Sequence, residues 1–267
     1  MAKILDFVKE HAIHTVLLDA AGTIYNDRGP FEGVVDAISA LQEQGVRVMV
    51  ATNNTTRSIF GIRSSLLSYG IDIPEPLIIS SGLVLRDVPD FRRHIDGKRV
   101  YVVGSEESDD YVTLAGGRVT QDLDQAQAVV LASSFAQGNN DWISALRQFV
   151  AGHPEVPLLC INPDRYVQHA GDRYPVIGHY VDELLKETGG TVLFGGKPEP
   201  SFSVCVQTVL DGLRVPVGRG VLFCDDNPYN VLQLSSDLGV HGAYLKETGL
   251  LFEFDGDDAI HTWAKLV

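Results

Sequence analysis

Cysteines and long apolar runs are scarce in this chain of 267 residues, and their scarcity excludes several classes of protein. The three cysteines, Cys160, Cys205 and Cys224, each lie within an apolar run and have no CxxC spacing. This pattern favours buried thiols in a reducing compartment over disulfides or zinc ligands. No run approaches the roughly 18 apolar residues of a membrane span, and the opening "MAKILDFVKEHAIH" is charged too early for a secretory signal. We therefore expect a cytoplasmic protein without a membrane partner.

Positive charge is also in short supply. Lysine and arginine number 21 against 35 acidic residues, which gives a formal net charge of −14. A polyanion such as a nucleic acid would be repelled unless a local basic patch overrode this field. The densest basic stretch, "FRRHIDGKR" at 91–99, is interrupted by Asp96 and is typical of an ordinary solvated surface. The sequence thus predicts no nucleic-acid partner.

What the chain does contain is a regular alternation of apolar runs and amphipathic segments. The runs are mostly continuous, as expected of strands buried on both faces, and lie at 15–19, 46–52, 77–81, 99–104, 128–133, 157–161, 191–196, 220–225 and 242–245. Between them, helices are predicted within 31–45, 57–70, 141–152, 179–190 and 201–213. Such alternation is typical of the α/β class with a doubly wound parallel sheet.

Polar residues follow several of the predicted strands. In doubly wound sheets ligands bind at the carboxyl ends of the strands, so these residues are expected to converge on one edge. They are Asp19 to Thr23, Thr52-Asn53-Asn54, Ser80-Ser81, Gly195-Gly196-Lys197 and Asp225-Asp226-Asn227. The set contains acids, a lysine, hydroxyls and amides, but no cysteine or histidine.

The acids at two strand ends indicate a cation site. A single aspartate such as Asp19, in "VLLDAAGT", also has an ordinary explanation as a helix N-cap or a turn residue. A second strand end with the adjacent pair Asp225-Asp226 makes that explanation less satisfactory, because carboxylates from neighbouring strand ends form the oxygen-ligand site that Mg²⁺ prefers. The sequence therefore predicts a magnesium site.

Two further strand ends fit a phosphoryl group. "ATNNT" at 51–55 offers a hydroxyl, amides and the free N–H groups of a following helix, which is also compatible with a simple N-cap. In "GGKPEP" a lysine, Lys197, follows two glycines and can act as a point charge on phosphate. This segment is not a P-loop, because Thr191 and Pro198 stand where that motif requires glycine and a hydroxyl residue.

The order of these motifs resembles the haloacid dehalogenase-like (HAD) superfamily, specifically its class IIA phosphatases of the nitrophenylphosphatase and phosphoglycolate phosphatase type. "DAAGTIYNDRGPFEG" is similar to the first motif, "ATNNT" to the second, "GGKPEP" to the third and "CDDNPYN" to the fourth. "INPDRYVQHAGDRYPVIGHYVDELLKETGG" resembles the passage from the cap domain back to the core in that branch. The resemblance covers nearly the whole chain and implies hydrolysis of a small phosphorylated metabolite with Mg²⁺ as cofactor.

The resemblance also implies a role for each matching residue. Asp19 would be the nucleophile that forms an aspartyl-phosphate, and Thr52 and Lys197 would hold the phosphoryl group. Asn53 and Asn54 would help to bind phosphate or substrate. The metal would be held by the side chain of Asp19, the backbone carbonyl of residue 21, and the acids of the fourth motif, which are Asp225 and Asp226.

The fourth motif departs slightly from the family pattern. The family's glycine is Cys224 here, and its later acid falls at Asn230 if Asp225 is taken as the first acid. Which of Asp225, Asp226 and Asn230 binds the metal is left open, although metal binding is still expected.

The first motif departs more seriously. The family's phosphatases have D-x-D-G-T, in which the second aspartate protonates the leaving alcohol and activates water, and this residue is Ala21. The chain could be a phosphatase of reduced or altered activity that favours acyl or aryl phosphates. It could instead be a pseudoenzyme that binds a phosphorylated ligand. A phosphonatase is less well supported because residues 24–51 contain no lysine for a Schiff base, and a deliberately introduced alanine is a fourth explanation.

Two domains are predicted from the resemblance. A Rossmann-like HAD core would comprise residues 1–81 and 190–267, and an inserted α/β cap domain of the class IIA type would comprise 82–189. The cap would close over the strand ends and select the substrate, with Asn162, Asp164 and residues near Tyr174 to His179 as candidate contacts, although hinge or turn roles are equally compatible. A homodimer formed through the cap is left open as a further partner.

Overall fold

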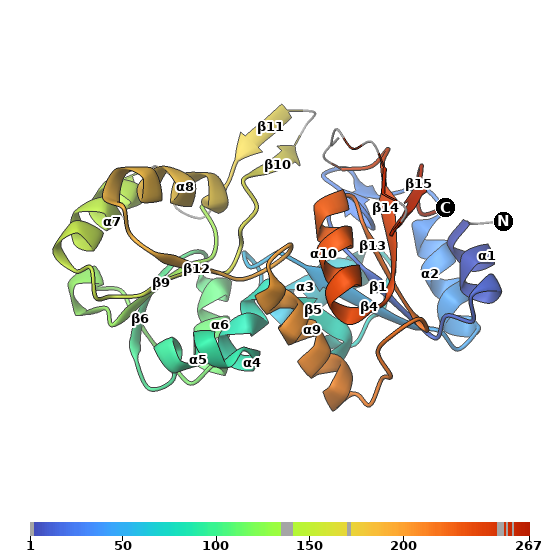
Figure 1. Ribbon diagram of the computed structural model, residues 1–267, viewed down its shortest axis with the longest axis horizontal. Helices are drawn as coiled ribbons and strands as arrows, with labels where there is room; N and C mark the ends of the chain where they lie inside the picture. The colour runs from blue at the N-terminus through green and yellow to red at the C-terminus, as the bar shows by residue number, and fades with distance from the viewer. Residues whose placement is uncertain (1–2, 135–140, 170–171, 250–253, 255, 258) are drawn as a thin grey trace.

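The computed structural model describes residues 3–134, 141–169, 172–249, 254, 256–257 and 259–267. These residues form two units, each built around a parallel sheet (Figure 1). The first unit has a six-stranded sheet in the order β15-β14-β13-β1-β4-β5. Its strands are β1 (Thr15–Leu18), β4 (Arg47–Thr52), β5 (Ile78–Ser80), β13 (Val221–Asp225), β14 (His241–Leu245) and β15 (His261–Trp263). The prediction of an α/β fold with a Rossmann-like parallel sheet and an inserted α/β unit is confirmed.

Helices cover both faces of this first sheet. They are α1 (Lys3–Glu10), α2 (Val34–Glu43), α3 (Ile59–Ser68), α9 (Pro200–Gly212) and α10 (Pro228–Leu238). Because neighbouring residues of a strand point to opposite faces, β1 contributes to two cores. Val16 and Leu18 pack in the core with α1, α2 and α3, whereas Leu17 lies in the core with α9 and α10. The sheet is therefore doubly wound.

The second unit lies beside the first and is inserted between β5 and α9 (Figure 1). Its five-stranded parallel sheet has the order β12-β9-β8-β6-β7. The strands are β6 (Arg99–Val103), β7 (Arg118–Thr120), β8 (Ala128–Leu131), β9 (Leu158–Cys160) and β12 (Val192–Phe194). The helices of this unit and the segment leading to it are α4 (Val84–Asp87), α5 (Pro89–Ile95), α6 (Asp109–Leu114), α7 (Asp141–Gly152) and α8 (Ile177–Thr188).

The strand β12 bears on the predicted domain boundaries. The division at residues 81 and 190 stays a prediction, but it would assign β12 to the core domain. In the structure β12 pairs with β9, with Val192 opposite Leu158, and so belongs to the second sheet. An apolar triplet fits either sheet equally well, so the sequence pattern could not decide between them.

All nine predicted strands and all five predicted helices are present, with ends shifted by a few residues. Several elements were not predicted. Two are antiparallel hairpins, formed by β2 (Tyr25–Asn26) with β3 (Gly29–Pro30) and by β10 (Tyr166–His169) with β11 (Asp172–Pro175). These strands are short and carry no continuous apolar run, so they lack the signal by which buried strands are found. The short 3₁₀ turns, at Glu75–Leu77, Ser81–Leu83, Glu106–Ser108 and Leu123–Gln125, were missed as well.

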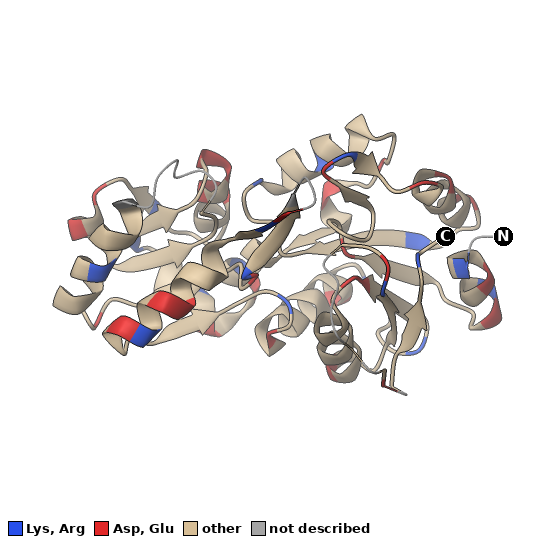
Figure 2. Cartoon of the chain, turned by 90° about the horizontal axis from the view of Figure 1, so that it is seen from above, with Lys and Arg blue, Asp and Glu red and all other residues tan. Residues whose placement is uncertain are grey.

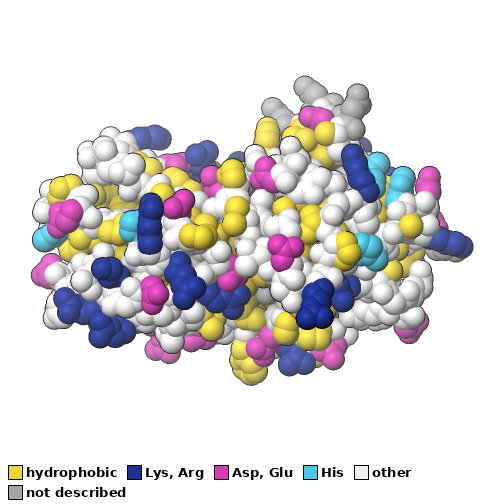
Figure 3. Space-filling view, turned by 60° about the horizontal axis from the view of Figure 1, so that its bottom comes forward, with side chains coloured by type: hydrophobic (Ala, Val, Ile, Leu, Met, Phe, Trp, Pro, Cys, Tyr) yellow, Lys and Arg dark blue, Asp and Glu magenta, His cyan; other side chains and the backbone are white. Residues whose placement is uncertain are grey.

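The surface is chemically mixed. Acidic and basic residues are interspersed over both units (Figure 2), and apolar side chains are scattered among charged ones on the face seen in Figure 3. No helix within the described residues has the length and apolar character needed to cross a bilayer. The three cysteines are free thiols and all are buried, as predicted.

Candidate active site

The candidate site lies where three neighbouring strands end. β1 is the middle strand of the three, with β4 on one side and β13 on the other. In the register of the sheet, Leu18 stands opposite both Val50 and Cys224, so the residues that follow these positions come side by side. The backbone N–H of Asp19 donates to the carbonyl of Cys224 at 2.9 Å, which fixes Asp19 next to Asp225.

Lys197 is the centre of the site. Its ammonium group donates to Oδ1 of Asp19 and to Oδ2 of Asp225, both at 2.6 Å, and to the backbone carbonyl of Ala51 at 2.9 Å. The lysine is 3% exposed, Asp19 6% and Asp225 1%. All three donor positions of the ammonium are thus satisfied, which is what a buried charge requires. The predicted proximity of a lysine and two acidic strand ends is present in the structure.

Asn53 fixes the backbone of this lysine. Its Oδ1 accepts from the N–H of Lys197 at 2.8 Å, and its Nδ2 donates to the carbonyl of Lys197 at 2.9 Å. The same Nδ2 donates to Oδ1 of Asp164 at 2.9 Å, which links the first unit to the loop after β9 in the second. Burial raises the pKa of Asp164, while the hydrogen bond from Asn53 opposes this rise.

The acidic residues form a group that fits a metal ion. Within the described part of the chain, Asp19, Asp225 and Asp226 are the group whose carboxylate oxygens lie within 4.8 Å of one another. Asn230, at the start of α10, donates from Nδ2 to both carboxylate oxygens of Asp225, at 3.2 and 3.1 Å. Its Oδ1 is buried and has no hydrogen-bond partner among the described residues. Three buried carboxylates and an unsatisfied amide oxygen are oxygen donors of the kind that suit a hard divalent cation.

Glycine is required where the first motif turns. Gly22 has φ of +89°, and a Cβ built on it would lie 2.6 Å from Oδ2 of Asp226. Any other residue would therefore collide with a predicted metal ligand as well as adopt a left-handed conformation. This close approach explains why a glycine follows Ala21.

Burial controls the electrostatics of the site. It raises the pKa of Asp19, and although the charge of Lys197 opposes the rise, the neighbouring charge of Asp225 adds to it. Burial alone would lower the pKa of Lys197, but Asp19 and Asp225 outweigh it and raise that pKa above its usual value. The lysine therefore stays positively charged, and a cation bound beside Asp19 would stabilise the ionised form of that carboxyl group.

The remaining predicted residues lie around this centre. Thr52 is 3% exposed, and its hydroxyl accepts from the N–H of Asn54 at 3.1 Å at the end of β4. Asn54 in turn accepts on Oδ1 from the N–H of Thr56, also at 3.1 Å. Ala21 is exposed, and its backbone bridges to Tyr25. Its methyl group has no acidic proton, so Ala21 cannot act as the general acid that an aspartate would supply at this position.

One residue near the site, Tyr25, was not predicted from the sequence. Tyr25 lies in the β2–β3 hairpin, and burial together with the charge of Asp19 raises the pKa of its phenol to about 12. No predicted strand end marks it, and within the segment that resembles the first motif only its distance of a few residues from Asp19 could have indicated it.

The predicted cap contacts divide into two groups. Asp164 reaches the site through Asn53, and Asn162 supports it by accepting the N–H of Asp164 on Oδ1 at 3.1 Å. Tyr174 lies in β11 and is 41% exposed. His179 lies in α8, and its Nδ1 is 3.3 Å from the hydroxyl of Tyr166, which belongs to the same unit.

Comparisons with known proteins agree with this arrangement. Residues 16–118, which include the first two motifs, match the family described as haloacid dehalogenase-like hydrolases. The resemblance to the HAD superfamily is thereby confirmed. The third and fourth motifs lie beyond this match, and the structure brings them to the same site.

Solved structures and curated relatives resemble this chain over most of their length. The 4-nitrophenylphosphatase of Thermotoga maritima superposes with a TM-score of 0.79 at 18% identity, covering 96% of this chain and 95% of that one. The glycerol phosphate phosphatase of Mycobacterium tuberculosis in complex with magnesium gives 0.75 at 20% identity, with 91% and 70% covered. Among curated proteins, an acid sugar phosphatase of Staphylococcus saprophyticus is 25% identical over 195 residues, 73% of each chain.

Proposed function

We propose that the chain is a Mg²⁺-dependent phosphatase of small phosphorylated metabolites that acts through an aspartyl-phosphate on Asp19. The observation that carries the proposal is the convergence of Asp19, Asp225 and Asp226 within 4.8 Å around the buried ammonium of Lys197. The names of the relatives support the substrate class, since they include an acid sugar phosphatase and a 4-nitrophenylphosphatase.

Mg²⁺ would be held by the carboxylates of Asp19, Asp225 and Asp226, with the carbonyl of Ala21, and when bound it neutralises charge on the phosphoryl oxygens. One oxygen of Asp19 attacks phosphorus, a new P–O bond forms, and the bond to the leaving group breaks. Lys197 supplies fixed positive charge beside the attacking oxygen. Water then cleaves the aspartyl-phosphate to regenerate Asp19 and release phosphate.

Ala21 determines which substrates suit this site. An alkoxide leaving group needs a proton as it departs, and the methyl group of Ala21 has none to give. Acyl and aryl phosphates need no such proton, because carboxylate and phenolate are stable leaving groups. We therefore propose that acyl and aryl phosphates are turned over faster than sugar phosphates.

A Mg²⁺ titration with steady-state assays on acetyl phosphate, 4-nitrophenyl phosphate and a sugar phosphate tests the proposal. We expect turnover of the first two, and Asp19→Asn should abolish it. The exposed Asp110→Asn is the matched control and should keep the parent rate.

The absence of a proton donor at Ala21 favours one alternative, a pseudoenzyme that binds Mg²⁺ and a phosphorylated ligand. In that case calorimetry would show binding of a sugar phosphate with Mg²⁺, while none of the three substrates would be hydrolysed. Turnover that depends on Asp19 would exclude this alternative.

A further inference from the structure

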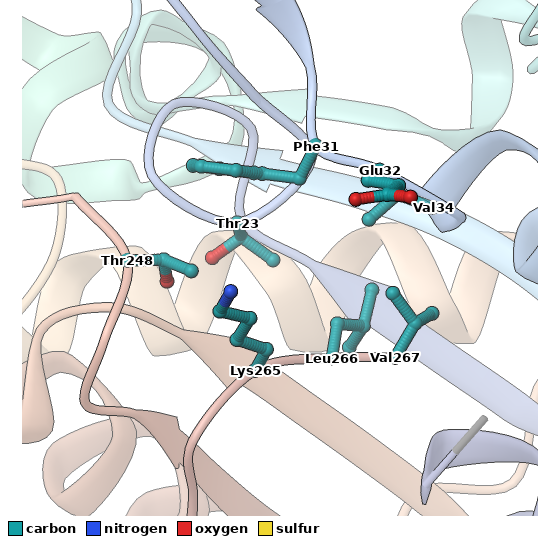
Figure 4. Close-up of a pocket in the computed structure, with 8 residues that line it drawn as sticks. All are labelled: Thr23, Phe31, Glu32, Val34, Thr248, Lys265, Leu266 and Val267. Atoms are coloured by element: carbon teal, nitrogen blue, oxygen red, sulfur yellow. The ribbon is translucent and has the colours of Figure 1, made fainter.

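A second concave site lies beside the turn that carries Ala21 and Gly22. It is a pocket of about 290 Å³, lined by the turn after β1, the segment that enters α2, the loop after β14 and the residues that follow β15 (Figure 4). None of Asp19, Asp225 and Asp226 lines it. The pocket is thus distinct from the acidic site, and the function proposed above makes no use of it.

An unsatisfied hydroxyl marks the floor of this pocket. Thr23 is 1% exposed, and its Oγ1 has no hydrogen-bond partner among the described residues. Figure 4 shows this hydroxyl directed toward the space between Thr248 and Lys265. Burying a hydroxyl without a hydrogen-bond partner costs free energy. A ligand that hydrogen-bonds to Thr23 would offset this cost, which favours binding.

The rim of the pocket carries one charge of each sign. Lys265 and Glu32 are both exposed, and in the described residues neither of them forms an ion pair. In Figure 4 the ammonium of Lys265 lies near Thr23, whereas Glu32 lies on the far side of the pocket. A dianion would be repelled by Glu32, so the lining fits a ligand with an acidic end and a separate hydrogen-bond donor.

The remaining wall is apolar. Val34 and Leu266 are 1% and 2% exposed, and Phe31 and Val267 complete this side of the pocket. One backbone hydrogen bond joins the end of this wall to α1. The carbonyl of Leu266 accepts from the N–H of Ile4 at 3.3 Å. An apolar wall opposite a few polar groups is typical of small-molecule sites.

We infer that this pocket binds a small carboxylic acid that carries an apolar side chain and an amino or hydroxyl group, such as an apolar amino acid. The carboxylate is placed to accept from Lys265 and from the hydroxyl of Thr23. The amino or hydroxyl group donates to Glu32, and the side chain packs on Phe31 and Val267, the half-buried members of the apolar wall. At roughly 30 Å³ per water the space equals about ten waters, which suits a ligand the size of leucine.

Titration of L-leucine into the full chain without Mg²⁺ or phosphate, followed by calorimetry or ligand-observed NMR, tests this inference. We expect saturable binding that Lys265→Met weakens about tenfold, since a charge-assisted hydrogen bond is lost. Thr23→Val should weaken binding severalfold. Its fold should be retained, because valine has the same shape and the hydroxyl it replaces has no hydrogen-bond partner among the described residues. Lys246→Met, an exposed lysine that does not line the pocket, is the matched control and should bind like the parent.

Two analogues test the assignment of the groups. Leucinamide lacks the carboxylate and 4-methylpentanoate lacks the amino group, and we expect both to bind more weakly than L-leucine. Leucinamide binding as tightly as leucine would overturn the role of Lys265. The whole inference is overturned if L-leucine shows no saturable binding up to its solubility limit, or if Thr23→Val and Lys265→Met both bind like the parent. Because binding is read directly without metal or substrate, failure here is distinguishable from failure of the proposed phosphatase activity.

Discussion

Lys197 and Asp19 form a buried ion pair across the carboxyl ends of the sheet, with Nζ 2.6 Å from Oδ1. The same ammonium is 2.6 Å from Oδ2 of Asp225. One lysine thus holds together two carboxylates from adjacent strands. Without this cation the acidic strand ends would repel one another in a region closed to water.

Removing this cation should destabilise the fold. In Lys197→Met, Asp19 and Asp225 stay buried without compensation, and we expect the free energy of unfolding to fall by about 3–5 kcal/mol. Mg²⁺ should restore part of this loss by supplying positive charge to the same carboxylates. Urea unfolding with and without Mg²⁺ measures both effects. Lys246→Met serves as an exposed control, and a Lys197→Met protein as stable as the parent would contradict the prediction.

Restoring the missing acid should raise activity. Ala21 is exposed, so Ala21→Asp adds a carboxyl group without disturbing a packed core. General acid–base help contributes typically ~10²–10⁴ in rate, and we expect kcat for a sugar phosphate to rise within that range. Acetyl phosphate hydrolysis should change far less, because its leaving group needs no proton. An unchanged sugar phosphate rate with intact Mg²⁺ binding would show that the missing acid is not what limits turnover.

Gly22 should be required for tight Mg²⁺ binding as well as for the turn. Gly22→Ala places a methyl group against Asp226, whereas Gly45→Ala, at φ of +77°, meets nothing within 4 Å. Both variants pay about 1–2 kcal/mol for the left-handed backbone, and Gly22→Ala carries the collision with Asp226 in addition, so it should be the less stable of the two. Only Gly22→Ala should lose Mg²⁺ affinity, by about 10–100-fold. Calorimetric titration with Mg²⁺ compares the two, and equal affinities would refute a role for the close approach to Asp226.

A group of histidines should make stability depend on pH. Burial lowers the pKa of His241 and of His261 below 6.5, and the charges of Arg219 and His11 lower them further. Below about pH 6.5 the unfolded chain therefore takes up protons that the folded chain resists, so stability falls as pH falls. Between pH 7.5 and 5.5 the change in melting temperature should be more negative in the parent than in His241→Gln/His261→Gln, because both proteins share the opposing contribution of the raised Asp19 pKa and only the parent has the two histidines. The same pH dependence in the double variant would contradict the prediction.

The sequence alone determined the class of fold and the composition of the site. Continuous apolar runs mark strands buried on both faces, and their alternation with amphipathic segments leaves a doubly wound parallel sheet as the natural solution. Because every strand of such a sheet runs in one direction, Asp19, Thr52 and Asp225 had to meet at one edge. Those inferences need only the local pattern of burial.

Tertiary structure decided the contacts between segments that are far apart in the chain. Asn53 bonds to the backbone of Lys197, 144 residues away, and no local pattern encodes that pair. Strand β12 pairs with β9 and so belongs to the second sheet. Its three apolar residues would suit a strand in either sheet, so the sequence does not specify which one. The unpaired hydroxyl of Thr23 and the place of Lys197 between two carboxylates likewise follow from how packed elements approach one another. These contacts depend on how all the helices and strands of both units pack together. A single segment of sequence carries no information about that packing.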